Sequence, residues 1–225
     1  MSNQPAADAL VLFGATDDLS KKKLMPALYH MQRHGRLNVP VIGVARSTWT
    51  DRDFRRHAEE SVLAAVPDAD PAVIQAVCKR LDLVQGDYSD PHTWATLAKK
   101  LDHHHSRVAV FYMAIPPDMF PEVATALASV GLNDRGRIVV EKPFGRDLAS
   151  AIELNQTLHN VFPEDRIFRI DHYLGKESVE DLLVFRFSNT LLEPVWNRNY
   201  VRSVQITMSE TIGVEGRGSF YDGVG

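Results

Sequence analysis

The sequence predicts an α/β protein whose main domain is a doubly wound parallel sheet. Short apolar runs of about five residues alternate with longer helical patterns, which is typical of parallel strands joined by crossover helices. A glycine-containing loop, residues 14–19, lies between the first apolar run and the first helical pattern. Phosphate-binding turns of dinucleotide-binding sheets stand at this place, so we expect a Rossmann-like domain.

The expected elements follow one another in a regular order. Each predicted strand is a short apolar run bounded by turn residues. In chain order the strands are Ala9–Phe13, Val39–Ala45, Leu81–Gln85, Arg107–Met113 and Arg137–Glu141. Each helix begins at a capping residue or a proline. The helices begin at Ser20, at about Arg52, at Pro71 after the cap Asp70, at Asp90-Pro91, and after Pro116-Pro117.

The first predicted helix has a clear apolar face. Leu24, Leu28 and Met31 are spaced to share that face, Ser20 is placed to cap the helix, and Gly35 ends it. Gly131 is expected to end the fifth predicted helix, as Gly35 ends the first.

Beyond Lys176 the pattern changes. One helical stretch is followed by a turn containing Trp196 and Asn197, and then by an alternating run, Arg202–Thr207, that predicts a strand. We therefore expect a dinucleotide-binding domain over residues 1–175 and the beginning of an α+β domain over residues 176–225.

Composition excludes several classes of protein. In 225 residues, 44% are apolar and 24% are charged, and the net charge of −4 gives no electrostatic reason to expect nucleic acid or a membrane surface. The single cysteine, Cys78, fits a reducing compartment. Without an apolar run of membrane-spanning length or a signal sequence, a cytoplasmic location is expected. Consecutive histidines at 103–105 cannot all face one metal ion on a regular element, so they predict a solvated loop.

The glycine loop is the first candidate site. It comprises Gly14, Ala15, Thr16, Asp17, Asp18 and Leu19. Backbone N–H groups and the helix N-terminus would attract a pyrophosphate there. Asp17 puts a carboxylate into this loop, and two orientations are open. Facing the phosphates at about 4 Å, it would repel them by ~1 kcal/mol in water and ~4 kcal/mol at a protein surface; turned outward, it would cap the helix.

Four further strand ends carry residues that are candidates for the cofactor site. Arg46 follows the second strand, where an arginine suits the 2′-phosphate of NADP and an acid would suit NAD; an ordinary surface arginine is the alternative. Gly86 and Asp87 follow the third strand, and residues 114–117 follow the fourth. Lys142 follows the fifth, where it could sit between nicotinamide and sugar, and Pro143 is a candidate for a cis peptide bond.

A dense polar run lies near the domain boundary. Asp171, His172, Tyr173 and Lys176 stand within six residues, with Gly175 allowing a tight turn. Lysine supplies point charge, while histidine and tyrosine supply directional donors, a combination suited to a sugar phosphate. A solvated strand-to-helix turn is the alternative reading of this run.

Several of these motifs together resemble the glucose-6-phosphate dehydrogenase family. The resemblance rests on the 14–19 loop with its continuation through Tyr29, on Arg46-Ser47, on the 169–177 run, on residues 196–200 and on residues 210–218. The family has glycine where this chain has Asp17. Glu141-Lys142-Pro143 also occurs in other Rossmann sugar oxidoreductases, which leaves such a reductase as an alternative.

The resemblance implies a function and a set of roles. It implies oxidation of D-glucose 6-phosphate with NADP, with Lys142, His172, Tyr173, Lys176 and Glu210 as substrate ligands. Asp171 would orient a catalytic histidine that the resemblance places beyond Gly225, so these 225 residues would hold only the start of a substrate and dimerisation domain. The full-length family is homo-oligomeric. A non-catalytic NADP-binding or regulatory protein is the second hypothesis.

Overall fold

The structure, a computed structural model, describes residues 5–171 and 175–207 of the chain. It divides the chain into two units, Met1–Arg169 and Ile170–Gly225, which are described separately below. The functional boundary expected between residues 175 and 176 stays a prediction.

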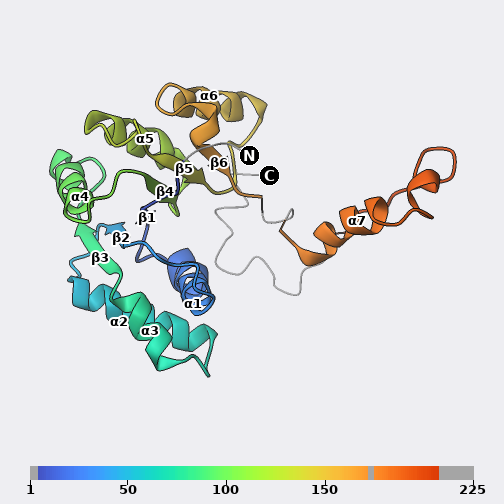
Figure 1. The fold of residues 1–225 in the computed structure, drawn as a ribbon. Helices are drawn as coiled ribbons and strands as arrows, with labels where there is room; N and C mark the ends of the chain where they lie inside the picture. Colours follow the sequence, from blue (N-terminus) through green and yellow to red (C-terminus); the bar gives the residue numbers. More distant parts are fainter. Residues whose placement is uncertain (1–4, 172–174, 208–225) are drawn as a thin grey trace. The chain divides into compact units, whose positions relative to one another are not determined.

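The first unit is built on a six-stranded sheet in the order β3-β2-β1-β4-β5-β6, in which every neighbouring pair is parallel (Figure 1). The strands are β1 Ala9–Phe13, β2 Val41–Ala45, β3 Leu81–Gln85, β4 Ala109–Met113, β5 Arg137–Val140 and β6 Ile167–Arg169. The strand order reverses at β1, whose neighbours are β2 and β4. Ligands of such sheets bind at this switch point, beyond the carboxyl ends of the strands. The predicted doubly wound parallel fold is confirmed.

Helices cover both faces of the sheet (Figure 1). One group consists of the π-helical turn η1 Ser20–Leu24, α1 Met25–Arg33, α2 Asp51–Ala65 and α3 Pro71–Cys78. The other consists of α4 Pro91–His103, the short η2 Pro117–Met119, α5 Phe120–Ser129 and α6 Leu148–His159. The cap predicted at Asp70 is confirmed, because its carboxylate accepts a hydrogen bond from the N–H two residues ahead. Asp90, expected with Pro91 to open a helix, caps α4 in the same way.

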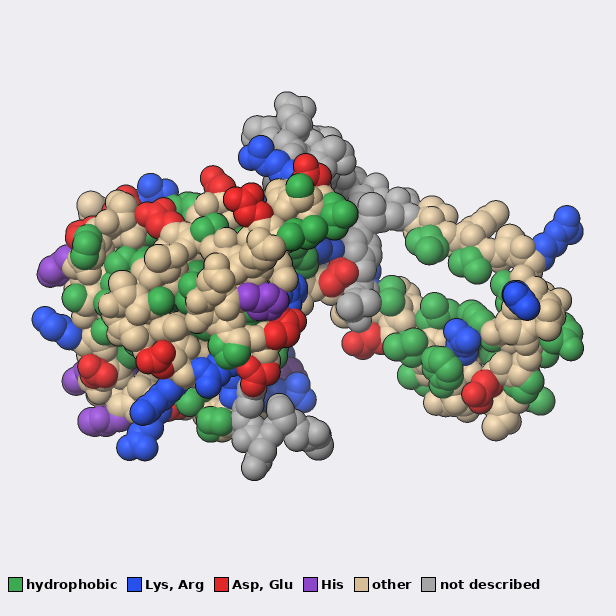
Figure 2. Space-filling view, turned by 90° about the horizontal axis from the view of Figure 1, so that it is seen from above, with side chains coloured by type: hydrophobic (Ala, Val, Ile, Leu, Met, Phe, Trp, Pro, Cys, Tyr) green, Lys and Arg blue, Asp and Glu red, His purple; other side chains and the backbone are tan. Residues whose placement is uncertain are grey.

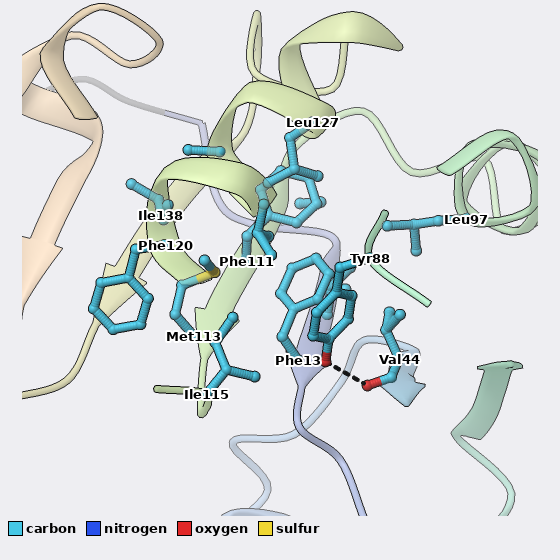
Figure 3. Packing of buried hydrophobic residues seen from close by; sticks show 14 of the residues in the cluster. Phe13, Val44, Tyr88, Leu97, Phe111, Met113, Ile115, Phe120, Leu127 and Ile138 are labelled. Atoms are coloured by element: carbon cyan, nitrogen blue, oxygen red, sulfur yellow. Dashed lines mark hydrogen bonds between the residues drawn. The ribbon is translucent and has the colours of Figure 1, made fainter. Parts of the chain in front are cut away.

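Successive side chains along the strands pack into two separate hydrophobic cores. Phe13 of β1 packs with Phe111 of β4 and Trp94 of α4 in one core, part of which is shown in Figure 3. Leu12, the neighbour of Phe13, belongs to the second core with Tyr29 of α1. Because successive side chains of a strand point to opposite faces, a strand buried on both sides reads as a continuous apolar run. This is why β1 and β2 were recognisable in the sequence.

The start of the first helix differs from the prediction. Ser20 does not cap it: the backbone N–H of Lys21 already donates to the carbonyl of Asp17 at 3.0 Å, so the helical turn opens three residues earlier. Ser20 is instead buried inside η1, and its hydroxyl has no partner in the described part of the chain. Of the residues expected to share one face of this helix, Leu28 is buried and Met31 is 39% exposed, while Tyr29 belongs to the same core as Leu28.

Two elements of the first unit were not predicted. Helix α6 follows the Asp147 cap, whose carboxylate accepts from the N–H of Ser150 at 2.8 Å. Strand β6 has only three residues, and two of them are exposed. A half-exposed edge strand lacks the apolar run by which the other strands were found.

The second unit contains helix α7, Glu177–Phe187, and a short turn, η4 Glu193–Val195. The predicted strand Arg202–Thr207 is wrong, because residues 201–207 have no regular structure. A strand needs a neighbour to pair with, and none of the described residues supplies one. Apolar side chains lie on the surface of this unit, among them Leu183, Phe185 and Phe187 of α7 (Figure 2).

Two features are absent from the described residues. None of their helices has the length and apolar character needed to cross a membrane. They also contain no cluster of acidic, histidine or cysteine side chains that could hold a metal ion. The histidine run begins in the last turn of α4, and His104 Nε2 lies 2.7 Å from Oδ2 of Asp82.

Candidate functional site

A cavity of about 340 Å³ lies at the switch point of the sheet. It is bordered by the loops that follow four neighbouring strands, β1, β2, β3 and β4. Its lining residues are Gly14, Thr16 and Asp17, then Ala45, Arg46 and Ser47, then Tyr88, and finally Ile115, Pro116 and Met119. Four predicted cofactor residues, at positions 14, 16, 17 and 46, therefore share one cavity.

Gly14 is required by the geometry of the first loop. Its φ angle is +71°, a conformation that side chains disfavour. A Cβ atom added to Gly14 would lie 2.2 Å from the carbonyl oxygen of Ala114, which follows β4. The absence of a side chain lets the β1 loop and the β4 loop approach each other closely at the floor of the cavity.

Tyr88 holds this loop in place. Its hydroxyl accepts a hydrogen bond from the N–H of Gly14 at 2.9 Å. The same hydroxyl donates to the carbonyl of Val44 at 3.3 Å (Figure 3). The ring is 5% exposed and meets Phe13 edge-on, with 5.7 Å between ring centroids. Burial raises the pKa of the Tyr88 phenol to about 12, so it is a neutral donor at physiological pH.

Asp17 is the unusual feature of the loop. Its carboxylate Oδ2 lies only 3.1 Å from the position of a notional Cβ on Gly14, and the residue lines the cavity. The carboxylate accepts no hydrogen bond from any described residue at the start of the helix. Of the two orientations considered above, the structure therefore has the one toward the cavity. Partial burial raises the pKa of Asp17, and the nearby positive charge of Arg46 opposes that shift.

Arg46 and Asp87 extend from the ends of neighbouring strands. Arg46 Nη1 lies 3.7 Å from Oδ2 of Asp87, with both side chains at least half exposed. Hydrogen bonds from the Ser89 backbone and hydroxyl, followed by the charge of Arg46, lower the pKa of Asp87. Exposed ion pairs contribute about 0–1 kcal/mol, so the guanidinium can turn to an incoming phosphate at small cost.

The other loop residues that were predicted to bind a cofactor have different surroundings. Ala15 is fully buried in the core of the α1 face. Asp18 points to solvent and forms an ion pair with Lys22 at 2.8 Å. Leu19 is half-buried. Gly86 makes room for Thr93, whose Oγ1 would lie 1.9 Å from an added Cβ. None of the four is among the residues that line the cavity.

Lys142 stands just after β5, half-buried, and the peptide bond between Lys142 and Pro143 is cis, which confirms the prediction for Pro143. The preceding Glu141 is 8% exposed and accepts a hydrogen bond from the phenol of Tyr112 on β4. Burial, together with this bond, raises the pKa of Tyr112.

The predicted substrate residues belong largely to the second unit. Asp171 and Lys176 are described and have exposed side chains. His172, Tyr173 and Glu210 lie outside the described residues. Their assigned roles stay predictions.

Sequence reasoning missed two polar residues of the cavity. Tyr88 was seen only as a neighbour of Gly86 and Asp87, because a phenol that bonds backbone groups 74 and 44 residues away leaves no local signal. Ser47 lines the cavity beside Arg46, and its buried hydroxyl has no partner within the described ranges.

The shape and donors of the cavity fit a phosphorylated nucleotide. It lies at a strand-order reversal, beside a helix N-terminus, with Arg46 as its cation and apolar Ile115 and Met119 on the far wall. Asp17 is the one lining residue whose charge opposes an anionic ligand.

Comparisons with known proteins agree with this geometry. The family model "Glucose-6-phosphate dehydrogenase, NAD binding domain" matches residues 11–181, and "Glucose-6-phosphate dehydrogenase, C-terminal domain" matches residues 183–225. The glucose-6-phosphate 1-dehydrogenase of Rhizobium meliloti (strain 1021) is 42% identical over 220 residues, which are 96% of this chain and 45% of the relative. A glucose-6-phosphate 1-dehydrogenase of Mycobacterium tuberculosis is 41% identical over 98% of this chain and 47% of its own length.

Solved structures give the same result. The crystal structure of the Mycobacterium avium glucose-6-phosphate 1-dehydrogenase superimposes with a TM-score of 0.87 at 41% identity, covering 98% of this chain and 48% of that one. A glucose-6-phosphate dehydrogenase in complex with its substrate glucose-6-phosphate gives a TM-score of 0.90 at 37% identity, covering 100% and 49%. The chain thus spans slightly less than half the length of the relatives it matches, and it belongs to the glucose-6-phosphate dehydrogenase family.

Proposed function

We propose that this chain binds NADP at the Gly14 cavity and corresponds to the N-terminal portion of an enzyme that oxidises D-glucose 6-phosphate to 6-phosphogluconolactone. This is the first step of the oxidative pentose phosphate pathway and takes place in the cytoplasm. The supporting observation is the cavity itself: a glycine loop, a helix N-terminus and Arg46 meet where a parallel sheet reverses its strand order.

The choice of NADP rests on Arg46. The side chain extends from the end of β2, where the ribose of the adenosine half lies in folds of this type. Its only described ion pair is the weak, exposed one with Asp87. A guanidinium can make a bidentate contact with a 2′-phosphate, whereas Asp87 could accept from ribose hydroxyls.

The remaining roles follow from family membership. When bound, NADP supplies the hydride acceptor. Lys142 stands at the end of β5 and is proposed to position the sugar. His172, Tyr173, Lys176 and Glu210 are proposed to hold the sugar phosphate and hydroxyls, with Asp171 orienting a catalytic base.

Equilibrium calorimetry with NADP+ and NAD+ tests the cofactor assignment. Arg46→Ala is expected to weaken NADP+ binding by about tenfold to a hundredfold, the loss of a charge-assisted bond, and to change NAD+ binding little. Arg56→Ala removes an exposed guanidinium of α2, paired with Asp53, and is the matched control. Equal affinity for both nucleotides in wild type and Arg46→Ala would contradict the assignment.

A second experiment separates an enzyme from a non-catalytic NADP-binding protein, the alternative that the Asp17 carboxylate favours. Glucose 6-phosphate is titrated into the chain and into Lys176→Ala, and reduction of NADP+ is followed by absorbance. Sugar-phosphate binding that is lost in Lys176→Ala supports the dehydrogenase proposal. NADP+ binding with no sugar-phosphate binding supports the alternative.

A further inference from the structure

We propose that Asp17 is an internal competitor for the phosphate subsite of this cavity, so that binding of an anionic dinucleotide is coupled to protonation of Asp17. The inference rests on the proposed function, because it concerns how tightly and at what pH the same cavity takes NADP. In this proposal the ionised carboxylate of Asp17 opposes the binding of NADP.

The position of the carboxylate is the first part of the argument. Asp17 Oδ2 lies close above Gly14, 3.1 Å from where a Cβ of Gly14 would be, and Asp17 lines the cavity. The carbonyl of Asp17 accepts from the N–H of Lys21 at 3.0 Å, which places the residue at the N-terminus of the helical segment. Backbone N–H groups at such a terminus attract anions, so the carboxylate occupies the place where phosphate oxygens would go.

Local charge is the second part. Among the residues that line the cavity, Asp17 and Arg46 are the two charged ones, so their charges cancel before any ligand enters. Arg46 also faces Asp87 at 3.7 Å from the end of β3. The phenol of Tyr88 also lines the cavity, and its raised pKa of about 12 keeps it neutral at physiological pH. On the helical segment itself, Asp18 and Lys22 neutralise each other at 2.8 Å, and Lys21 follows in the first turn.

Asp17 has an ordinary backbone conformation. A substitution there can therefore test the effect of its charge separately from any effect on folding. Among the described residues other than glycine, His105 alone has a positive φ, so Asp17 is not held in a left-handed conformation. Substitution at position 17 therefore carries no special backbone strain. The carboxylate also makes no described hydrogen bond whose loss would unfold the helix start.

Protonation would relieve the conflict. Partial burial already raises the pKa of Asp17, and the approach of phosphate oxygens would raise it further because like charges disfavour the ionised form. Binding should therefore take up a proton and become tighter as the pH falls toward the pKa of Asp17. With Asp17 protonated, the cavity offers Arg46 and the backbone donors without an opposing charge.

Calorimetric titration of the chain with NADP+ tests this inference. Asp17→Asn keeps the size of the side chain and removes its charge, and Asp17→Gly removes both. At about pH 8, each is expected to lower the Kd for NADP+ by at least about fivefold, because like charges at ~4 Å repel by about that factor even in water. Asp68→Asn, an exposed carboxylate in the loop between α2 and α3, is the matched control and should leave the Kd unchanged.

The pH dependence gives an independent readout. The ratio of the wild-type Kd to the Asp17→Asn Kd should fall toward one as the pH is lowered through the raised pKa of Asp17, since protonation removes the charge that the variant lacks. This ratio cancels the titration of the 2′-phosphate itself. Titrations in buffers of different ionisation enthalpy should show proton uptake that Asp17→Asn reduces.

The outcomes are distinguishable. Failure of every variant and of the wild type to bind NADP+ would overturn the proposed function. NADP+ binding by wild type, with equal or weaker binding by Asp17→Asn and Asp17→Gly, would overturn this inference and leave the proposed function standing.

Discussion

The backbone N–H of Gly14 donates a hydrogen bond to the hydroxyl of Tyr88 at 2.9 Å, joining the loop after β1 to the segment after β3. The same hydroxyl donates to the carbonyl of Val44 at the end of β2. One phenol thus connects the carboxyl ends of three neighbouring strands. The shape of the nucleotide loop depends on a residue 74 positions away in the chain.

Tyr88→Phe tests the importance of this connection. The substitution removes the hydroxyl to which the buried N–H of Gly14 donates, and a buried donor left unpaired costs about 1–3 kcal/mol of the free energy of unfolding. We expect a loss of that size in denaturant titration, together with weaker NADP+ binding. Tyr200→Phe removes a phenol from a residue that is 70% exposed and should change neither. An unchanged free energy of unfolding in Tyr88→Phe would show that the hydroxyl does not hold the loop.

The pKa of Tyr88 leads to a prediction for alkaline pH. Burial raises this pKa from its usual 10 to about 12 in the folded protein. Between these pH values the folded state binds more protons than the unfolded state. The contribution of the Tyr88 phenol to the free energy of unfolding is therefore complete below pH 10 and is lost as pH approaches 12. Tyr88→Phe should flatten the fall in stability over this range. Tyr112, whose pKa is also raised, requires a parallel Tyr112→Phe measurement. If the free energy of unfolding fell with alkaline pH in the same way in wild type and in Tyr88→Phe, the fall could not be assigned to the Tyr88 phenol.

Much of the fold could be predicted from sequence because its signals are local. Strands such as Ala9–Phe13 are buried on both faces, so every residue in them is apolar. The caps Asp70 and Asp90 act on residues two positions ahead. The errors lie where tertiary context decides. Arg202–Thr207 alternates like a strand but has no partner strand among the described residues, and an alternating pattern alone cannot supply one.

The candidate site was predicted in part for the same reason. Loop position at a strand end identified Gly14 and Arg46 correctly as neighbours of one cavity. It also selected Gly86, which lies against Thr93 and does not line the cavity; its role toward a cofactor stays a prediction. The orientation of Asp17 depends on side-chain geometry and could be left only as two alternatives.

Gly14→Ala is predicted to be far more damaging than Gly35→Ala. Both glycines have a positive φ, +71° and +68°, so both substitutions carry a similar backbone cost of about 1–2 kcal/mol. A new Cβ at Gly14 would also meet the carbonyl oxygen of Ala114 at 2.2 Å, whereas nothing lies within 4 Å at Gly35. The difference between their free energies of unfolding therefore measures the contact between the β1 and β4 loops. Equal losses in the two variants would mean that the loops do not approach so closely.

Gly86→Ala tests whether this glycine serves the ligand or the fold. An added Cβ would lie 1.9 Å from Oγ1 of Thr93, which donates to the carbonyl of Asp87 at 2.8 Å, so overpacking should cost about 1–3 kcal/mol. Thr93→Ala removes Oγ1 and Cγ2, which would lie 1.9 and 2.9 Å from the added Cβ, and leaves the Thr93 Cβ at 2.8 Å. We expect the double variant to lose less stability than the sum of the singles, with a coupling of roughly 1 kcal/mol.

Thr125→Ala provides the control for this double-mutant cycle. Thr125 donates to a backbone carbonyl on the exposed side of α5, so the stability losses of Thr125→Ala and Gly86→Ala should add. If Gly86→Ala instead weakens NADP+ binding without loss of stability, Gly86 borders the ligand and the packing explanation fails. If it lowers stability and the coupling with Thr93 is present, the glycine is needed because helix α4 begins so close to the end of β3.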